Sequence, residues 1–238
     1  MRMTCLMPTY GRKRLVENSI ACFLAQDHPA DVRRLLILDD SGYLENCEGE
    51  GWKLFTRNQR LPSLIDKYKE LVALDDGWAD AFVIWDDDDI YLPWHLSSHA
   101  AVLQPGTWSQ PATVWSLYNG LNIEPTGGRF WASASVSRSL LDECGGFRPI
   151  LRADFDQQHL KLWDKTGGPA ARPSRTGYVY GWGRSNHGSS LMSSPECTTW
   201  YDKAVPMEAN GGTVVPAFDE QTVLTVLRIS SAGSSSEQ

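Results

Sequence analysis

Hydrophobic and polar residues follow two alternating patterns along the first third of the chain. Apolar runs within 3–8, 33–42 and 81–85 are short and continuous, as in strands buried inside a sheet. Between these runs, residues 14–26 and 63–74 carry apolar side chains at helical spacing, which predicts helices with one apolar face each. The order strand, helix, strand, helix, strand is typical of a doubly wound α/β sheet.

Polar residues follow the end of each predicted strand. We expect Pro8 to stop the first strand, and the polar segments that follow the strands are Thr9–Gly11, Asp39–Ser41 and Asp86–Asp89. In α/β sheets of this kind, ligands bind beyond the carboxyl ends of the strands. Three polar segments at one edge therefore predict a ligand site at that edge.

The four consecutive carboxylates of residues 86–89 have two explanations. A run of like charges is commonly a solvated loop that binds nothing. Here the apolar run 82–85 precedes the carboxylates, and Ile90, Tyr91 and Leu92 follow them, so the loop is drawn towards the core from both sides. Carboxylates at a core edge need a counter-charge, and Mg2+ and Mn2+ prefer oxygen ligands. The acidic run alone leaves both explanations open, and the neighbouring polar strand ends favour a site.

Composition places the chain among ordinary soluble globular proteins of about one domain. It has 238 residues, of which 42% are apolar and 21% are charged. Its five cysteines form no CxxC pair, which fits reduced thiols in a cytoplasm. The sequence shows no signal peptide and no membrane span. We therefore expect a cytoplasmic protein, with a disordered low-complexity tail over 229–238.

The net charge of −7 is unevenly distributed along the chain. Residues 129–184 contain nine Lys and Arg against five Asp and Glu, so this segment is basic. A basic face can attract a polyanionic partner, such as nucleic acid, even on an acidic protein. The same charges can instead balance bound carboxylates and a diphosphate, and we favour this second explanation.

Four segments, taken together, resemble the family 2 glycosyltransferases. They are the opening, 5–42; the acidic segment "FVIWDDDDIYLP"; residues 129–163, with a Gly-Gly-Phe and a later acidic pair; and "YGWGRSNHGSS" at 180–190. The acidic segment is similar to the DxD segment of that family, and the four occur in the family's order with near-usual spacing. The resemblance extends from about residue 3 to about residue 190.

The resemblance implies an α/β fold of the GT-A type, a Rossmann-like mixed sheet flanked by helices. We expect a single GT-A domain over 1–228. Within it, 1–95 would bind the nucleotide sugar, 96–200 would bind the acceptor, and 201–228 would form a C-terminal extension.

The resemblance also implies a nucleotide-sugar site at the strand ends. Tyr10 is expected to contact the base, and Asp40 to accept a hydrogen bond from a ring N–H of the base. Lys67 could reach a donor phosphate, although a lone lysine on an amphipathic helix is more often plain surface. The full set expected to bind the nucleotide sugar is Pro8, Thr9, Tyr10, Arg12, Asp39, Asp40, Lys67, Asp86 and Asp87.

A divalent cation, Mn2+ or Mg2+, is the cofactor that the resemblance implies. Asp86 and Asp88 match the two aspartates of the DxD pair, and Asp89 is third in line. His187 resembles a late histidine of the family that reaches back to the metal or the diphosphate. The additional Asp87 makes the register of the metal ligands ambiguous. A further departure is Gly11, where the family often has Asn or Asp.

Asp154 matches the position of the catalytic base in inverting members of the family, and Asp156 is the competing candidate. The family's usual Glu before the base is Ala153 here, which keeps Asp156 in consideration. Leu160 and Trp163 continue at i, i+3 spacing, so we expect the two aspartates to lie at the start of a helix. At a helix start they would point apart by roughly 200°, and only one would face the donor.

The expected function is metal-dependent transfer of a sugar, by preference from a UDP-sugar, to a hydroxyl acceptor with inversion. The acceptor stays open between a soluble glycan, a protein and a hydroxymethylated base in DNA, as used by phage-type DNA glycosyltransferases. Two other classes are a nucleotidyltransferase and an inactive module that binds sugar nucleotides or glycans. "PTYGRKR" has only one glycine after the first strand, which argues against the nucleotidyltransferase.

Overall fold

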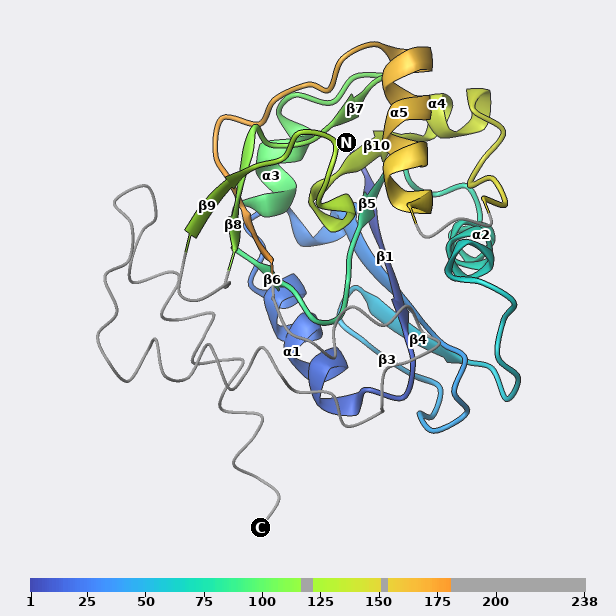
Figure 1. Cartoon of the computed structure of the whole chain (residues 1–238). Coiled ribbons are helices and arrows are strands. Elements are labelled where there is room, and N and C mark those ends of the chain that lie inside the picture. Colours follow the sequence, from blue (N-terminus) through green and yellow to red (C-terminus); the bar gives the residue numbers. More distant parts are fainter. Residues whose placement is uncertain (117–121, 151–153, 181–238) are drawn as a thin grey trace.

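The computed structural model describes residues 1–116, 122–150 and 154–180. His187, the extension expected over 201–228 and the tail expected over 229–238 lie outside these described residues. Figure 1 shows the described part as one α/β body, with the amino-terminal strand β1 at its centre.

A seven-stranded mixed sheet forms the centre of this body, with the order β3-β4-β2-β1-β5-β10-β7. Strands β4, β2, β1 and β5 run parallel, whereas β3 and β10 are antiparallel to their neighbours. The strands are β1 (Met3–Thr9), β2 (Arg33–Asp39), β3 (Cys47–Gly49), β4 (Trp52–Thr56), β5 (Ala81–Ile84), β7 (Trp108–Ser109) and β10 (Ser135–Ser137). The sequence-based expectation of a buried parallel sheet is confirmed, because every residue of β1 is buried.

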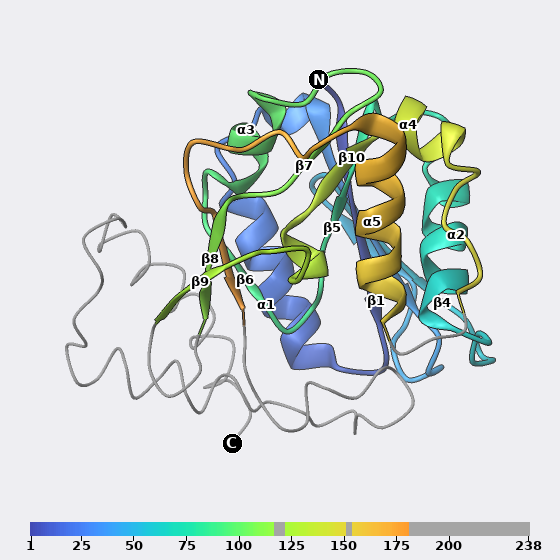
Figure 2. The ribbon, with the colours of Figure 1, turned by 45° about the horizontal axis from the view of Figure 1, so that its top comes forward.

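Helices cover both faces of this sheet. Helix α1 (Lys13–Leu24) connects β1 to β2, and α2 (Leu64–Leu74) connects β4 to β5 in the opposite direction across the sheet. Because such crossovers are right-handed, the two helices lie on opposite faces, as Figure 2 shows. Ser63 caps the start of α2 by accepting a hydrogen bond from the backbone of Asp66.

Strand β1 continues past Pro8, which corrects the expectation that this proline stops the strand. Pro8 pairs with Leu38 of β2, whereas the pairing with β5 ends at Leu6 opposite Ile84. The carbonyl of Leu6 accepts a hydrogen bond from Trp85, so Leu6, and Pro8 two residues later, face the β5 side. The missing N–H of Pro8 therefore faces β5 at a point where the hydrogen bonds between β1 and β5 have already ended.

The sequence patterns missed the hairpin of β3 and β4. Strand β4 extends the parallel part of the sheet beyond β2, with Leu35 opposite Trp52 and Asp39 opposite Thr56. Only Leu54 of β4 is buried, because β4 lies next to the edge strand of the sheet. A strand with one buried residue in five gives almost no hydrophobic signal.

A second, four-stranded sheet has the order β6-β11-β8-β9. Its strands are β6 (Ile90–Tyr91), β8 (Thr113–Ser116), β9 (Asn122–Pro125) and β11 (Tyr178–Tyr180). The remaining helices are α3 (His95–Ala100), α4 (Arg138–Glu143), α5 (Phe155–Gly167) and the short 3-10 turns η1 (Ala30–Val32) and η2 (Trp131–Ser133). Strand β6 directly follows the acidic run, so this sheet brings β11 beside that run.

Within the described ranges, every helix is too short or too polar to cross a lipid bilayer.

Candidate functional site

The polar ends of β1, β2 and β5 meet through direct side-chain contacts, as the sequence predicted. Thr9, at the end of β1, donates a hydrogen bond to Oδ2 of Asp87 at 2.5 Å. The backbone N–H of Gly11 donates to Oδ1 of Asp39 at 2.7 Å. Lys67 of α2 lies between these ends and donates to the carbonyl of Thr9 at 2.7 Å. The site therefore lies at the carboxyl edge of the parallel strands.

Gly11 occupies a position that a larger residue would strain. Its φ of +65° lies in the left-handed region, which favours glycine. A Cβ atom at this position would come within 2.9 Å of Oγ of Ser41. The departure from the family's usual Asn or Asp is thus explained by the close approach of the β1 and β2 loops.

Three carboxylates of the acidic run, Asp86, Asp88 and Asp89, come together at this edge. One oxygen from each lies within 4.8 Å of the others. A set of three clustered carboxylate oxygens suits a hard divalent cation such as Mg2+ or Mn2+. The donor set of the described residues therefore fits the expected cofactor, and Asp89 lies in the same cluster as Asp86 and Asp88. His187 lies outside the described residues, so its expected part stays a prediction.

Asp87 points away from these three carboxylates. Its side chain is wholly buried, and it contacts Thr9 and forms an ion pair with Arg12. Arg12 also donates to Oδ2 of Asp88 at 3.0 Å. A direct contact of Asp87 with a nucleotide sugar stays a prediction, because in this arrangement the side chain faces protein groups. Arg12, with 12% of its side chain exposed, links the start of α1 to the acidic run.

Burial makes the acidic run difficult to ionise fully. It raises the pKa of Asp86 to about 7, and the neighbouring charges of Asp88 and Asp87 add to this shift. Burial also raises the pKa of Asp87 to about 6, although the guanidinium of Arg12 opposes the shift. A bound cation would relieve the same repulsion, so these carboxylates are arranged for a positive partner.

Lys67 is buried, with 1% of its side chain exposed, which corrects the alternative that it is plain surface. It forms an ion pair with Asp40, whose side chain is wholly buried. The other oxygen of Asp40 accepts a hydrogen bond from the backbone of Leu61 at 2.9 Å. Burial lowers the pKa of Lys67, and Asp40 opposes that shift. A direct contact of Asp40 with a base stays a prediction, because in this structure the Asp40 side chain is buried and pairs with Lys67.

Tyr10 lies above this ion pair and carries a partner that the sequence analysis missed. The guanidinium of Arg60 lies 4.5 Å from the centre of the Tyr10 ring, and the ammonium of Lys67 lies 5.5 Å from it. Nη2 of Arg60 is buried and makes no hydrogen bond with any described residue. The attraction of these two cations to the ring helps to hold Tyr10 at this edge of the sheet.

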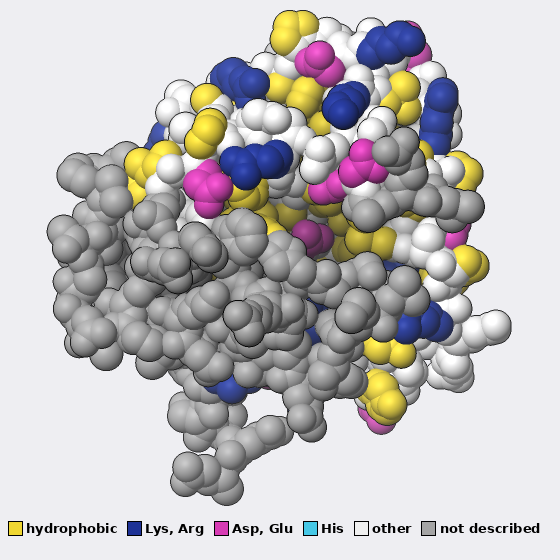
Figure 3. Space-filling model, in the orientation of Figure 1, with side chains coloured by type: hydrophobic (Ala, Val, Ile, Leu, Met, Phe, Trp, Pro, Cys, Tyr) yellow, Lys and Arg dark blue, Asp and Glu magenta, His cyan; other side chains and the backbone are white. Residues whose placement is uncertain are grey.

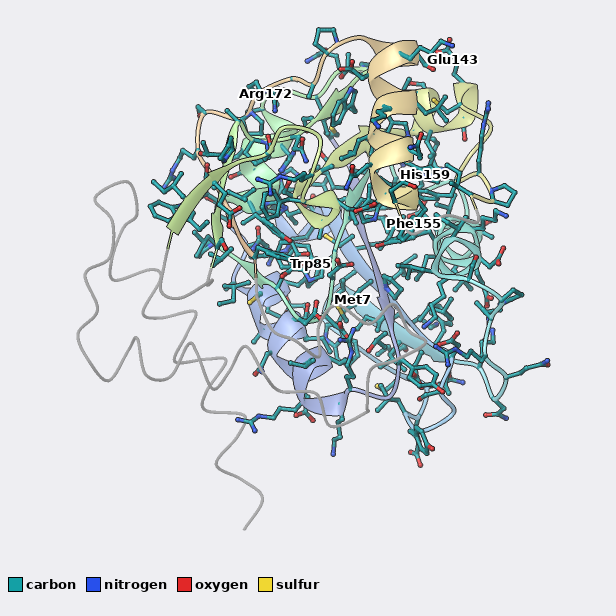
Figure 4. The ribbon with its side chains drawn as sticks, viewed as in Figure 1. Met7, Trp85, Glu143, Phe155, His159 and Arg172 are labelled. Carbon is teal, nitrogen blue, oxygen red and sulfur yellow. The ribbon has the colours of Figure 1, made fainter. Side chains whose placement is uncertain are left out.

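Asp154 and Asp156 lie at the start of α5, as predicted from the spacing. Asp154 is the N-cap residue, but its side chain does not cap the helix and accepts a hydrogen bond from Nε2 of Gln158 at 2.8 Å. Asp156 accepts from the backbone of Gln157 at 2.8 Å, and burial raises its pKa. The charge of Asp156 also adds to the raised pKa of Tyr68, which burial dominates. The start of α5 therefore faces the acidic run, and Figure 4 shows Phe155 of α5 above Trp85.

No protein-family model matches this sequence, and no curated protein matches it either. Solved structures do match its fold. The mannosyltransferase PcManGT of Pyrobaculum calidifontis, solved with GDP-Man and Mn2+, has a TM-score of 0.59 and 18% identity, over 98% of this chain and 73% of that one. TarS 1–349 of S. aureus, solved with UDP-GlcNAc, has a TM-score of 0.59 and 15% identity over the same shares. The chain has a GT-A glycosyltransferase fold.

The GT-A fold of this chain contains three tyrosines at the acidic run that the sequence analysis did not single out. Tyr68 donates to Oδ1 of Asp86 at 3.3 Å, and the backbone of Asp86 donates to the hydroxyl of Tyr91 at 2.6 Å. Tyr178 donates to Oδ2 of Asp89 at 2.5 Å. In the sequence, these residues are indistinguishable from apolar core positions, because only the fold brings their hydroxyls to the acidic run.

The basic segment of this GT-A fold uses many of its charges within the protein. Arg138 forms an ion pair with Asp75, and Arg129 with Glu124. Arg172 donates to the carbonyls of Gln110 and Pro111. Figure 3 shows the basic side chains on this face separated by acidic and apolar ones. A nucleic-acid partner for residues 129–184 stays a prediction.

Proposed function

We propose that this chain transfers a sugar from a nucleotide sugar to a hydroxyl acceptor, with the help of a divalent cation. The observation that carries the proposal is the cluster of Asp86, Asp88 and Asp89 at the carboxyl edge of a GT-A fold. The fold likeness supports it, because TarS binds UDP-GlcNAc and PcManGT binds GDP-Man and Mn2+ in the solved complexes. We further propose a UDP-sugar as the preferred donor.

The three clustered carboxylates would hold the cation. When bound, Mn2+ or Mg2+ supplies a Lewis acid that neutralises charge on a diphosphate leaving group. Arg12 lies beside the same carboxylates and can contribute a second positive charge at the donor phosphates. Tyr10, with Arg60 at its ring, would provide the surface for the base. The buried ion pair of Lys67 and Asp40 would hold Tyr10 in position.

Asp154 would act as the general base in an inverting reaction. The acceptor hydroxyl forms a bond to C1 of the sugar, the bond from C1 to the diphosphate breaks, and the carboxylate takes the hydroxyl proton. Asp156 is the competing candidate, and each of the two carboxylates accepts a hydrogen bond from α5. The acceptor is proposed only as a hydroxyl group, in a glycan, a protein or a modified base.

The proposal is tested by removing one carboxylate of the cluster. Asp88→Asn keeps the shape of the side chain, so the fold should persist while UDP binding loses its dependence on Mn2+. We expect at least a tenfold loss of affinity in calorimetric titration with UDP and Mn2+, as a lost charged contact implies. Asp142→Asn, an exposed change on α4, is the matched control and should bind as the parent does.

A panel of UDP- and GDP-sugars, assayed for Mn2+-dependent hydrolysis, completes this test. Turnover by the parent chain separates an enzyme from an inactive binding module. Mn2+-independent binding of UDP by the parent, unchanged in Asp88→Asn, would show that the acidic cluster does not hold a cation.

A further inference from the structure

The carboxylates of the acidic cluster accept hydrogen bonds from different parts of the chain. Tyr68 of α2 donates to Asp86 at 3.3 Å, Arg12 before α1 donates to Asp88 at 3.0 Å, and Tyr178 of β11 donates to Asp89 at 2.5 Å. The last contact is the shortest of the three. Both of its partners are buried, with 1% of Tyr178 and 2% of Asp89 exposed, whereas the other two carboxylates are only partly buried.

The position of Tyr178 is fixed by its strand and its neighbours. It lies opposite Tyr91 in the antiparallel pair of β11 and β6, and its ring centre is 5.6 Å from that of Tyr91. The preceding Gly177 lets β11 approach α3, because a Cβ atom there would lie 2.6 Å from the Cα of His95. The hydroxyl of Tyr178 therefore has little freedom to move away from Asp89.

A hydrogen bond from an immobile donor restricts the rotation of the carboxylate that accepts it. Residues that orient metal ligands in this way typically change metal affinity by about 10- to 100-fold when they are removed. Asp89 is the carboxylate of the cluster that the DxD pattern does not include, and its geometry depends on a strand of the second sheet.

We infer that Tyr178 is a positioning residue, whose hydroxyl orients Asp89 so that this third carboxylate can join Asp86 and Asp88 around a divalent cation. The inference rests on the proposed function, because it takes the acidic cluster as the cation site. It adds that the second sheet, through β11, takes part in cation binding.

The test is Tyr178→Phe, which removes one oxygen and keeps the packing of the ring. Binding of Mn2+ alone is measured from the electron paramagnetic resonance signal of the free ion. We expect the affinity to fall about tenfold or more relative to the parent chain. Tyr43→Phe, which removes a hydroxyl from a side chain that is 71% exposed, is the matched control and should bind Mn2+ as the parent does.

Thermal unfolding distinguishes positioning from a purely structural role. A positioning role shrinks the rise in melting temperature that Mn2+ produces, whereas a structural role lowers the melting temperature equally with and without Mn2+. Unchanged Mn2+ affinity in Tyr178→Phe overturns this inference and leaves the proposed function intact. Failure of the parent chain to bind Mn2+ overturns both.

A second variant covers the case in which Tyr178→Phe does not fold. Asp89→Asn keeps an oxygen that can accept the hydrogen bond from Tyr178 but removes the carboxylate charge. Its Mn2+ affinity should fall at least as far as that expected for Tyr178→Phe. Normal Mn2+ binding by Asp89→Asn overturns the inference, since Tyr178 would then orient a residue that the cation does not use.

Discussion

Asp154 and Asp156, at the start of α5, differ in the hydrogen bonds that they accept from the helix. Asp156 accepts a hydrogen bond from the backbone of Gln157, so its carboxylate is part of the first helical turn. Asp154 occupies the N-cap position without capping the helix and instead binds the amide of Gln158. Asp154 stays the proposed base because its position matches that of the base in the resemblance, and Asp156 is the alternative.

Asp154→Asn should therefore lower sugar transfer by on the order of 10²-fold or more, because the amide cannot accept the proton of the acceptor. Binding of UDP with Mn2+ should stay close to that of the parent chain, since the base contacts the acceptor. Transfer rates and UDP titrations on Asp154→Asn and Asp156→Asn form the measurement.

Asp156→Asn is the comparison variant for this pair, and its loss should be the smaller one. Full activity in Asp154→Asn, together with a large loss in Asp156→Asn, would assign the base to Asp156. Equal losses would indicate a shared or structural role for the two carboxylates.

At the scale of elements, the sequence predicted the elements that have a strong hydrophobic period. The strands β1, β2 and β5 and the helices α1 and α2 appear where apolar runs and helical spacing indicated them. The hairpin of β3 and β4 and the whole second sheet were not predicted, because their strands are two to five residues long. Strands this short are defined by their partners, which a single sequence does not show.

Part of the candidate site was also predictable from the sequence. The sequence predicted the acidic run, Tyr10 and Asp39 as site residues, because polar residues that directly follow a buried strand are easily recognised. Lys67 was ambiguous in the sequence, since only the fold shows that it is buried against Asp40. Tyr178 gave no signal at all, because its role depends on the pairing of β11 with β6.

The junction between β1 and α1 provides a prediction about backbone strain. Gly11 has a φ of +65°, and an added Cβ would also press on Ser41. Gly77, at the end of α2, has a φ of +74° but open space around it. Gly77→Ala should thus cost only the left-handed strain, about 1–2 kcal/mol, and Gly11→Ala should lower the free energy of unfolding further. Urea unfolding of both variants measures the difference.

An equal loss in the free energy of unfolding for Gly11→Ala and Gly77→Ala would show that the loops after β1 and β2 move apart without any further loss of stability. A larger loss for Gly11→Ala, accompanied by weaker UDP binding, would show that the contact between these loops also shapes the site.

At the scale of the whole molecule, the acidic run concentrates negative charge inside a protein whose net charge is already −7. The pKa of Asp86 is raised to about 7 and that of Asp87 to about 6, whereas aspartates in an unfolded chain titrate near pH 4. Between about pH 4 and pH 7 this pair binds more protons in the folded chain than in the unfolded chain, so its contribution to stability falls as the pH rises. Burial lowers the pKa of His95 and of His99, so these histidines make the opposite contribution.

The difference in free energy of unfolding between the metal-free parent chain and Asp86→Asn should therefore fall from pH 5 to pH 8. One pKa unit corresponds to about 1.4 kcal/mol, and we expect a fall of at least that size. Mn2+ should restore more stability at pH 8 than at pH 5, because the cation competes with protons for the same carboxylates. Urea unfolding with EDTA or with Mn2+ at the two pH values measures both effects.

Asp86→Asn serves as the reference, since its amide does not titrate and the contribution of the histidines, common to both chains, cancels in the comparison. A difference between the two chains that stays constant or rises from pH 5 to pH 8 would contradict the assignment of the effect to the acidic run.

The contact between Tyr178 and Asp89 joins residues that are 89 positions apart. A ribosome releases the chain from its amino end, so the acidic run emerges long before the strand that carries Tyr178. Until β11 pairs with β6, Asp89 lacks this donor, although the complete acidic sequence is already present. On the inferred role of Tyr178, the nascent chain acquires its full affinity for the cation only when folding reaches β11. Cation binding would then report, during synthesis, that β11 has joined the second sheet.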